Sequence, residues 1–306
     1  MVASRRGRAK RFFFVLPWVP LPFRVLIFPI LPSVSAGVYR TLGPGVGLLA
    51  LGVPLGLALL SWDQEGMGGT WVIHWVAMGP LFVEAFRRAR TLEGAMAGFL
   101  ISSLSLQAAL VSVHAVELGV APWTLVEKGM EASIRKALQS YGVMGMAPEG
   151  QPYARDVASA MARVLLALAP GMLVALDLLL GWWTLIVHRW TLSLRGLSVQ
   201  GPESLKGWAM PAVWVWVTIL GGLLMLLPGD LLPFIGVNLL VVMGAVHFLQ
   251  GIGVVATVFQ SRRVPPVLRG VLYALVFLQQ VFLLAVVAIG LFDVWFDFRR
   301  RWSGTA

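Results

Sequence analysis

The polar residues that interrupt long apolar runs are the groups in this sequence that could do chemistry. Asp177 lies near the middle of the apolar run 158–188. An ionised aspartate at the centre of a bilayer costs roughly 2.5–3.5 kcal/mol, so it has to be neutralised, paired or hydrated. The residues on its helical face, at 100° per residue, are Pro170, Thr184 and His188. We interpret Asp177 either as a protonatable or cation-coordinating group in a cavity, or as a structural group paired with a neighbouring helix.

A second polar stripe lies in the run 94–119. Its members, at steps of four, seven and three residues, are Ser103, Gln107, His114 and Glu117. Such a stripe faces either a water-filled cavity or a polar seam between two helices. Gln107 and His114 are candidate ligand-binding residues in the first case.

A third group of polar residues stands in the run 232–259. His247 and Gln250 are three residues apart and share a face, whereas Asn238 lies nine residues before His247, on the opposite side of a straight helix. We keep all three as candidate ligand-binding residues. Two further amides, Gln279 and Gln280, lie in the last apolar run and are expected to bridge helices.

No pattern in the chain predicts catalysis. Zinc-protease, nucleophile-elbow and phosphate-loop signatures are missing from the sequence. The sequence has no cysteine, and its four histidines lie on four different segments. We therefore expect a protein that is not an enzyme and that holds no metal ion or cofactor.

The composition predicts a membrane protein. Of the 306 residues 58% are apolar and 12% are charged, against about 25% charged in a typical soluble domain. That balance excludes a soluble enzyme, a disordered chain and a fibrous protein. The net charge of +10 is explained by basic residues that flank membrane spans, and no aromatic–basic module predicts nucleic-acid binding.

Seven apolar runs have the length of membrane-spanning helices, which need about 20 residues. They are residues 36–60, 71–88, 94–119, 158–188, 209–227, 232–259 and 267–292. Residues 12–32 form a further apolar segment, which is interrupted by five prolines and is read as a broken or re-entrant span. We expect an all-α membrane helix bundle of seven or eight spans, folded as one membrane-embedded domain over residues 1–306.

The first of these seven runs is rich in glycine. The pairs Gly43/Gly47 and Gly52/Gly56 have the small-xxx-small spacing that lets helices approach closely. They indicate helix packing and carry no information about a ligand.

The short loops predict the orientation, because cytoplasmic loops carry an excess of lysine and arginine. The basic loops contain Arg87, Arg88, Arg90, Arg189, Arg195, Lys206, Arg262, Arg263 and Arg269. The alternate loops contain Asp63, Glu65 and Asp230. We place the basic loops in the cytoplasm, although strict alternation over eight spans then puts the basic C-terminus, Arg299–Arg301, on the outside.

The long loop 120–157 is predicted to contain an amphipathic helix on the outer membrane surface. Its apolar residues recur every three or four positions; they are Trp123, Val126, Met130, Ile134, Leu138 and Tyr141. The helix serves either as a spacer at headgroup level or as a lid over a cavity.

Two stretches near the C-terminus carry a resemblance to a known family. One is Asn238 followed by His247-Phe248-Leu249-Gln250-Gly251, and the other is Gly290-Leu291-Phe292-Asp293 followed by Phe296-Asp297-Phe298-Arg299-Arg300. With the proline-rich start and the glycine-rich run, they resemble the YybS-like family of bacterial polytopic membrane proteins. That family is thought to be related to the S components of energy-coupling-factor vitamin transporters, and its shape is also similar to the rod-shape protein MreD.

The resemblance implies binding of a small molecule or of another membrane protein. Our first hypothesis is a small-molecule-binding or transporter-like protein of the bacterial inner membrane, with a cavity lined by Asp177, Gln107 and His114. The alternative is an envelope-assembly scaffold that binds other membrane proteins through a glycine-rich face. In both cases the lipid bilayer is a partner and nucleic acid is not.

Overall fold

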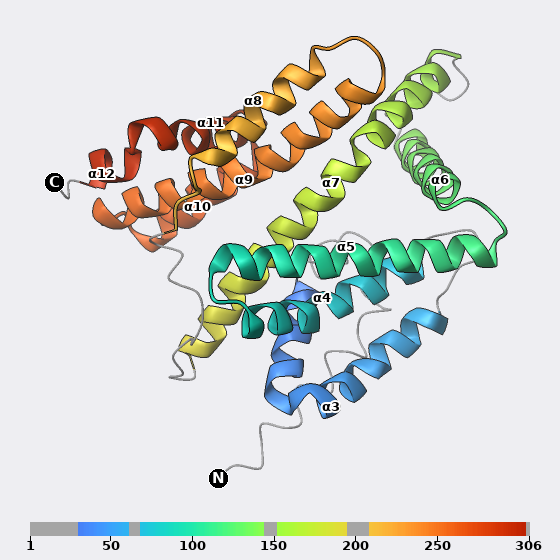
Figure 1. The fold of residues 1–306 in the computed structure, drawn as a ribbon, viewed down its shortest axis with the longest axis horizontal. Helices are drawn as coiled ribbons and strands as arrows, with labels where there is room; N and C mark the ends of the chain where they lie inside the picture. Colours follow the sequence, from blue (N-terminus) through green and yellow to red (C-terminus); the bar gives the residue numbers. More distant parts are fainter. Residues whose placement is uncertain (1–29, 61–67, 144–151, 195–207, 304–306) are drawn as a thin grey trace. The chain divides into compact units, whose positions relative to one another are not determined.

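The computed structural model describes residues 30–60, 68–143, 152–194 and 208–303, which form ten helices, α3 to α12, and no strand. Figure 1 shows these helices in chain order. The all-α prediction is therefore confirmed for this part of the chain. Most of the predicted segment 12–32 lies outside the described residues, as do Asp63, Glu65, Arg195 and Lys206.

The helices group into two compact units, and the long helix α7 (Pro152–Ser193) contributes to both. Unit 1 comprises residues 1–133 and 180–202, and unit 2 comprises residues 134–179 and 203–306. Pro170 lies inside α7 without ending it.

Unit 1 contains α3 (Leu31–Leu60), α4 (Gly68–Arg88), α5 (Leu92–Glu117) and the end of α7. Helix α4 packs against both α3 and α5. Its contact with α3 requires Gly79, because a Cβ there would lie 2.0 Å from Ser35 Oγ. In the same way, a Cβ on Gly181 of α7 would lie 2.6 Å from the Phe99 ring of α5.

Helix α3 is kinked at Gly43, which has a φ of 78° and a ψ of 169°. Beyond the kink the chain folds close to the preceding turn, since a Cβ on Gly47 would lie 2.8 Å from the Tyr39 Cα. The Gly43/Gly47 pair was predicted to pack against another helix. In the structure Gly43 forms the kink of α3, and Gly47 packs against Tyr39 of the same helix. A left-handed φ of this kind favours glycine, which has no Cβ to clash.

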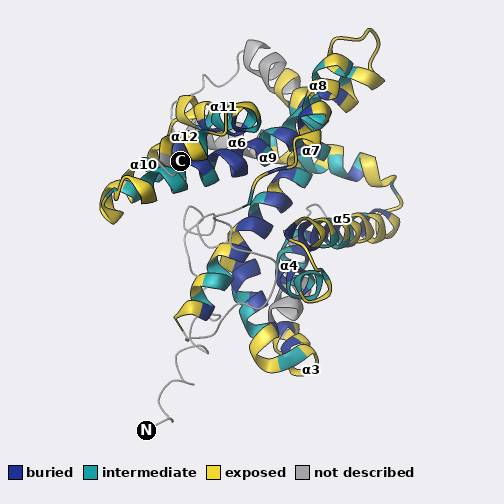
Figure 2. Cartoon of the chain, turned by 60° about the vertical axis from the view of Figure 1, so that its left-hand side comes forward, coloured by how far each residue is buried: buried dark blue, intermediate teal, exposed yellow. Residues whose placement is uncertain are grey.

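Unit 2 contains the first part of α7 and the helices α8 (Val213–Met225), α9 (Leu231–Ser261), α10 (Pro266–Leu278), α11 (Gln280–Phe296) and α12 (Phe298–Ser303). Helix α9 is its centre, since α8, α11 and α12 all pack against it. Figure 2 shows that α10 carries mostly partly buried and exposed residues.

Three helices are long and apolar enough to cross a membrane in the described part of the chain: α5, residues 160–193 of α7, and α9. The α10–α11 pair passes the same test only when its two helices are taken together, which gives up to four spans. The chain is thus a membrane protein with several candidate spans.

The last predicted span, 267–292, differs from the structure. Two helices occupy it, bent by 100° at a break between them. The break residue, Gln279, has extended backbone angles, and the side chains of Gln279 and Gln280 are exposed. The sequence did not predict this break. The residues on both sides of the polar pair are apolar, and a mean hydropathy over the whole run does not detect a change in chain direction.

The loop 120–157 contains helix α6 (Pro122–Val143). Leu125 is buried, Met130 and Ile134 are partly buried, and Trp123 is exposed. The side chains of Leu138 and Tyr141 lie outside the described part of the structure. The position of this helix at the outer surface stays a prediction.

Candidate functional site

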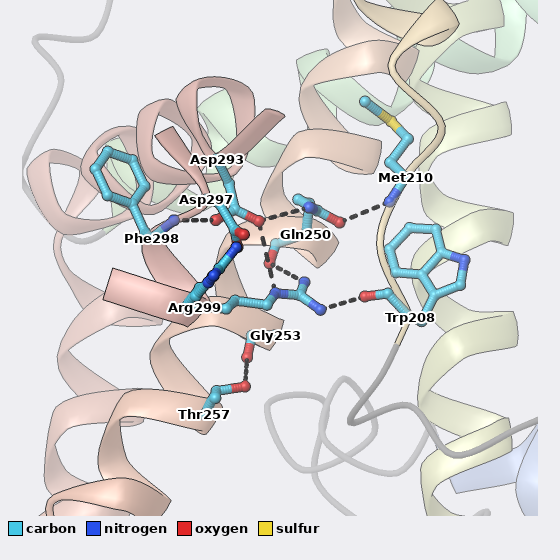
Figure 3. A network of polar contacts seen from close by, with 10 residues as sticks. Trp208, Met210, Gln250, Gly253, Thr257, Asp293, Asp297, Phe298 and Arg299 are labelled. Carbon is cyan, nitrogen blue, oxygen red and sulfur yellow. Dashed lines mark hydrogen bonds and ion pairs between the residues drawn. The ribbon is translucent and has the colours of Figure 1, made fainter. Parts of the chain in front are cut away.

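A buried polar cluster in unit 2 is formed by Gln250, Asp293 and Arg299, and we call it the C-terminal cluster (Figure 3). Gln250 on α9 is 1% exposed, and its Nε2 donates a hydrogen bond to Asp293 Oδ2 on α11 at 2.8 Å. Its Oε1 accepts one from the backbone N–H of Met210 at 3.0 Å. Both polar atoms of the amide are therefore bonded within the protein, as buried polar groups require.

Asp293 and Arg299 fasten helix α12 to this cluster. Asp293 Oδ1 accepts a hydrogen bond from the Phe298 N–H at 2.8 Å, and Arg299 Nε lies 3.5 Å from Asp293 Oδ2. The guanidinium also donates to the carbonyl oxygens of Gln250, at 3.3 Å, and of Trp208. One arginine thus joins α9, α11 and the segment before α8, as Figure 3 shows.

Arg299 stays positively charged although it is partly buried. Partial burial lowers the pKa of its guanidinium from the ordinary value, and the nearby carboxylates of Asp293 and Asp297 act in the opposite direction. An arginine stays protonated under physiological conditions even so. The cluster is therefore a charge-assisted hydrogen-bond network, the stronger kind.

The backbones of α9 and α11 cross beside this cluster at two glycines. A Cβ on Gly290 would lie 1.8 Å from the His247 carbonyl oxygen, and a Cβ on Gly251 would lie 2.0 Å from the Val286 carbonyl oxygen. Contacts this close exclude any side chain at either position. The two sequence stretches that carried the family resemblance therefore meet in space, and their shared role is helix packing.

The side chain of His247 contacts helix α8. Its Nε2 lies 2.8 Å from the Thr218 hydroxyl of α8. His247 Nδ1 is buried and has no hydrogen-bond partner among the described residues. The Gln250 side chain, three residues later, contacts α11 and the segment before α8.

Asn238 lies on another side of α9, as its nine-residue spacing from His247 predicts, and contacts α7. Its Oδ1 accepts a hydrogen bond from the Gly171 N–H at 2.6 Å, and its Nδ2 donates to the Ala167 carbonyl at 2.8 Å. A regular helix would pair those two backbone groups with each other. The second N–H of Nδ2 donates to the Phe234 carbonyl at 2.8 Å, so the amide bridges α9 to the backbone of α7 with both of its donors used.

The polar stripe of α5 belongs to unit 1 and is buried along most of its length. Ser103 and His114 are buried, and Gln107 is 8% exposed. His114 Nδ1 lies 3.4 Å from Glu117, whose side chain is largely exposed. Gln107 Nε2 is buried without a hydrogen-bond partner in the described part of the chain.

The stripe predicted on α7 is buried in part. Asp177 is 2% exposed and belongs to unit 2, whereas Thr184 and His188 belong to unit 1. Thr184 Oγ1 is buried without a hydrogen-bond partner among the described residues. His188 Nε2 lies 2.6 Å from Arg40 Nη1 of α3, a contact that the sequence did not indicate.

The carboxylate of Glu84 is held locally, near the end of α4. Arg87 and Arg88 lie 2.7 Å and 3.4 Å from Glu84 Oε2, and the Tyr39 hydroxyl donates to Oε1 at 3.0 Å. The salt bridge expected from the i+3 and i+4 spacing is confirmed. Glu84 is therefore a structural residue.

The six predicted site residues come from three helices. Gln107 and His114 lie on α5, Asp177 lies on α7, and Asn238, His247 and Gln250 lie on α9. A cavity shared by Asp177, Gln107 and His114 stays a prediction. Across the described residues no group of three or more histidine, aspartate and glutamate side chains is placed to hold a metal ion.

Sequence reasoning missed two partners of the polar residues. Arg299 was interpreted only as a C-terminal charge and a motif residue, and no contact was predicted for Trp208. The available signal for Arg299 was the run of three arginines, Arg299–Arg301, shortly after Asp293 and Asp297. The role of Trp208 had no such signal, because it contributes a backbone carbonyl.

Comparison with known proteins gives one result. No curated protein and no solved structure matches the chain. A sequence model of the family described as "Predicted membrane protein (DUF2232)" matches residues 12–294. This match covers most of the chain and includes both glycines of the α9–α11 crossing, Gly251 and Gly290, so the protein belongs to the DUF2232 family of predicted membrane proteins.

Proposed function

We propose that the protein is a multi-pass membrane protein that binds a small polar molecule within unit 1, in the manner of a transporter S component. The observation that carries this proposal is the buried Nε2 of Gln107 on α5, a candidate membrane span, which has no hydrogen-bond partner among the described residues. A buried donor without a partner costs about 1–3 kcal/mol. A polar ligand that accepts a hydrogen bond from Gln107 removes that penalty.

Two further features support unit 1 as the location. The hydroxyl of Thr184 is a second buried polar group of the same unit without a partner among the described residues. In unit 2, by contrast, the amides of Asn238 and Gln250 are bonded to protein groups at both ends. We therefore assign Asn238 and Gln250 to helix packing and Gln107 to ligand binding.

The chain is proposed to cross a bacterial inner membrane seven or eight times. Beyond the three candidate spans, α3, α4, α8 and residues 12–32 supply four further crossings, and the α10–α11 pair adds an eighth only where it crosses as a broken span rather than as a re-entrant pair. The relationship to the YybS-like family and to S components belongs to this proposal.

Mass spectrometry of co-purified small molecules tests the ligand. The wild-type chain is purified in mild detergent beside Gln107→Leu and Gln279→Leu, the second being a matched control at an exposed glutamine. We expect one small polar compound to be retained by the wild type and the control, and to fall at least tenfold in Gln107→Leu. Gln107→Leu should also be as thermally stable as the wild type, because leucine removes the unpaired donor. Identical small-molecule profiles in all three preparations would overturn the proposal.

A scaffold that binds another membrane protein is the second candidate, and one observation favours it. A Cβ on Gly45 or on Gly52 of α3 would meet no described atom within 4 Å, and Leu48 and Leu49 beside them are exposed. A face of this kind allows a partner helix to approach closely. Gly52→Leu should then abolish co-purification of that partner without lowering thermal stability, and an unchanged set of co-purified proteins would exclude this candidate.

A further inference from the structure

The C-terminal end of the chain presents an exposed surface of aromatic and basic side chains. Its members, which we call the aromatic–arginine surface, are the exposed Trp295, Phe296, Arg300, Arg301 and Trp302 and the partly buried Phe298. The Phe296 and Phe298 rings stack at 5.6 Å, and the Phe298 and Trp302 rings stack at 4.5 Å. Trp295 is 57% exposed.

We propose that this surface binds the anionic phospholipid headgroups of the membrane, on the face that also carries the Arg262–Arg263 turn. Tryptophan and other amphipathic aromatic rings settle at the level of the headgroups, and arginines next to them add attraction to anionic lipid. The inference is independent of the small-molecule site, which lies in unit 1.

The charges on this surface complement an anionic headgroup layer. Helix α12 has three arginines and no acidic residue. Arg299 is turned inward to Asp293, while Arg300 and Arg301 stay exposed. Arg301 lies over the Phe296 ring at 5.9 Å, a cation–π arrangement. The exposed Asp297 precedes these arginines, and its Oδ1 accepts a hydrogen bond from the Arg300 N–H at 3.4 Å.

The C-terminal cluster fixes the direction of this surface. Arg299 and the Phe298 N–H are both bonded to Asp293, so α12 cannot rotate freely about its axis. The neighbours of Arg299 in the sequence are therefore presented on the outside as a fixed set. Because these side chains are already held in place, the protein loses less conformational entropy when it binds.

The bend between α10 and α11 indicates on which face of the membrane α12 lies. At 1.5 Å per residue the two helices are about 20 Å and about 26 Å long, and each is shorter than the ~30 Å hydrocarbon layer. Their 100° bend fits a re-entrant pair that returns the chain to its starting face. Arg262 and Arg263 precede α10, and Arg300 and Arg301 follow α11, so both basic groups then lie on one face, as the positive-inside rule requires.

Lipid binding is tested by native mass spectrometry of the full chain, titrated with phosphatidylglycerol or phosphatidylcholine. The variant carries Arg300→Gln and Arg301→Gln, and the control carries Arg262→Gln and Arg263→Gln, which removes the same charge where this aromatic stack is missing. We expect the preference for phosphatidylglycerol to fall clearly more in the variant than in the control, by up to roughly thirtyfold for two arginines. Equal losses, or no loss in either, would overturn the proposal.

The membrane face is tested by cysteine labelling, for which the cysteine-free chain is well suited. Single variants Ser303→Cys and Arg263→Cys are exposed to a membrane-impermeant maleimide in intact cells and after permeabilisation. The proposal predicts that both cysteines react only after permeabilisation. Labelling of Ser303→Cys in intact cells, with Arg263→Cys still protected, would show that the chain crosses between them and would refute the shared face.

Discussion

The side chain of Asn238 on α9 is bonded to the backbone of α7 at Gly171, with 2.6 Å between Asn238 Oδ1 and the Gly171 nitrogen. Gly171 is required at this point, because a Cβ there would lie 2.8 Å from that same oxygen. The residue before it is Pro170, which cannot donate a backbone hydrogen bond. The amide thus reaches α7 where its backbone ladder is already interrupted.

Replacing Asn238 should therefore destabilise unit 2. Asn238→Leu leaves the Gly171 N–H and the Ala167 carbonyl without their side-chain partner, at a cost of about 1–3 kcal/mol. We expect a lower Tm in detergent for this variant and an unchanged Tm for Gln279→Leu, which alters an exposed amide. Equal melting temperatures for the two variants would contradict the structural role of Asn238.

Gly290→Ala tests the crossing of α9 and α11. The added methyl group would overlap the His247 carbonyl, so we expect the helices to separate and the protein to lose about 1–3 kcal/mol of stability. Gly244→Ala in α9 is the matched control, because a Cβ there meets nothing within 4 Å. The control should be neutral or more stable by about 0.5–1 kcal/mol, since alanine favours helix. A stable Gly290→Ala protein would disprove the close crossing.

The two charged members of the C-terminal cluster should differ in importance. Asp293→Leu removes the partner of Gln250, Phe298 and Arg299 together, whereas Arg299→Gln leaves the first two bonds in place. We expect faster hydrogen exchange in α12 for both variants and a larger fall in Tm for Asp293→Leu. Removing one partner of a fully buried pair costs about 3–5 kcal/mol, which is the upper limit here because Arg299 is only partly buried. A greater loss for Arg299→Gln would reverse this order.

Reporter fusions test the orientation predicted from the loops. Fusions at Arg88, Arg195 and Arg263 should report the cytoplasm, and fusions at Glu65 and Glu131 should report the outside, because the arginines and lysines concentrate in alternate loops. A cytoplasmic signal at Glu131, in α6, would show that the assignment is wrong.

Asp177→Asn distinguishes a role of Asp177 in ligand or partner retention from a structural role. The substitution preserves the shape of this buried residue and removes its titratable charge. A binding role predicts a thermal stability near the wild-type value and a fall in the retained ligand or partner. Both are measured on one preparation, because an ion-paired structural aspartate would instead lower stability. Unchanged retention together with unchanged stability would remove Asp177 from the candidate site.

The sequence by itself determined the class of the protein and the positions of most helices. An apolar run is a local property of the sequence, and in lipid such a run forms a helix because a helix satisfies the hydrogen bonds of its own backbone. The predicted run 94–119 corresponds to α5 (Leu92–Glu117), and the run 232–259 corresponds to α9 (Leu231–Ser261). Spacing also placed Asn238 and His247 on different sides of α9. The local salt bridge of Glu84 followed from neighbours one turn away.

Only the tertiary structure decided what the buried polar residues contact. Asn238 and Gln250 were candidate ligand-binding residues because an amide in an apolar run needs a partner, and the chain supplied those partners from residues 67 and 43 positions away. The break at Gln279 likewise depends on how α10 and α11 are held, which an average over apolar residues does not record. The sequence shows that a buried polar group needs a hydrogen-bond partner. Which residue becomes that partner depends on how helices from distant parts of the chain pack together.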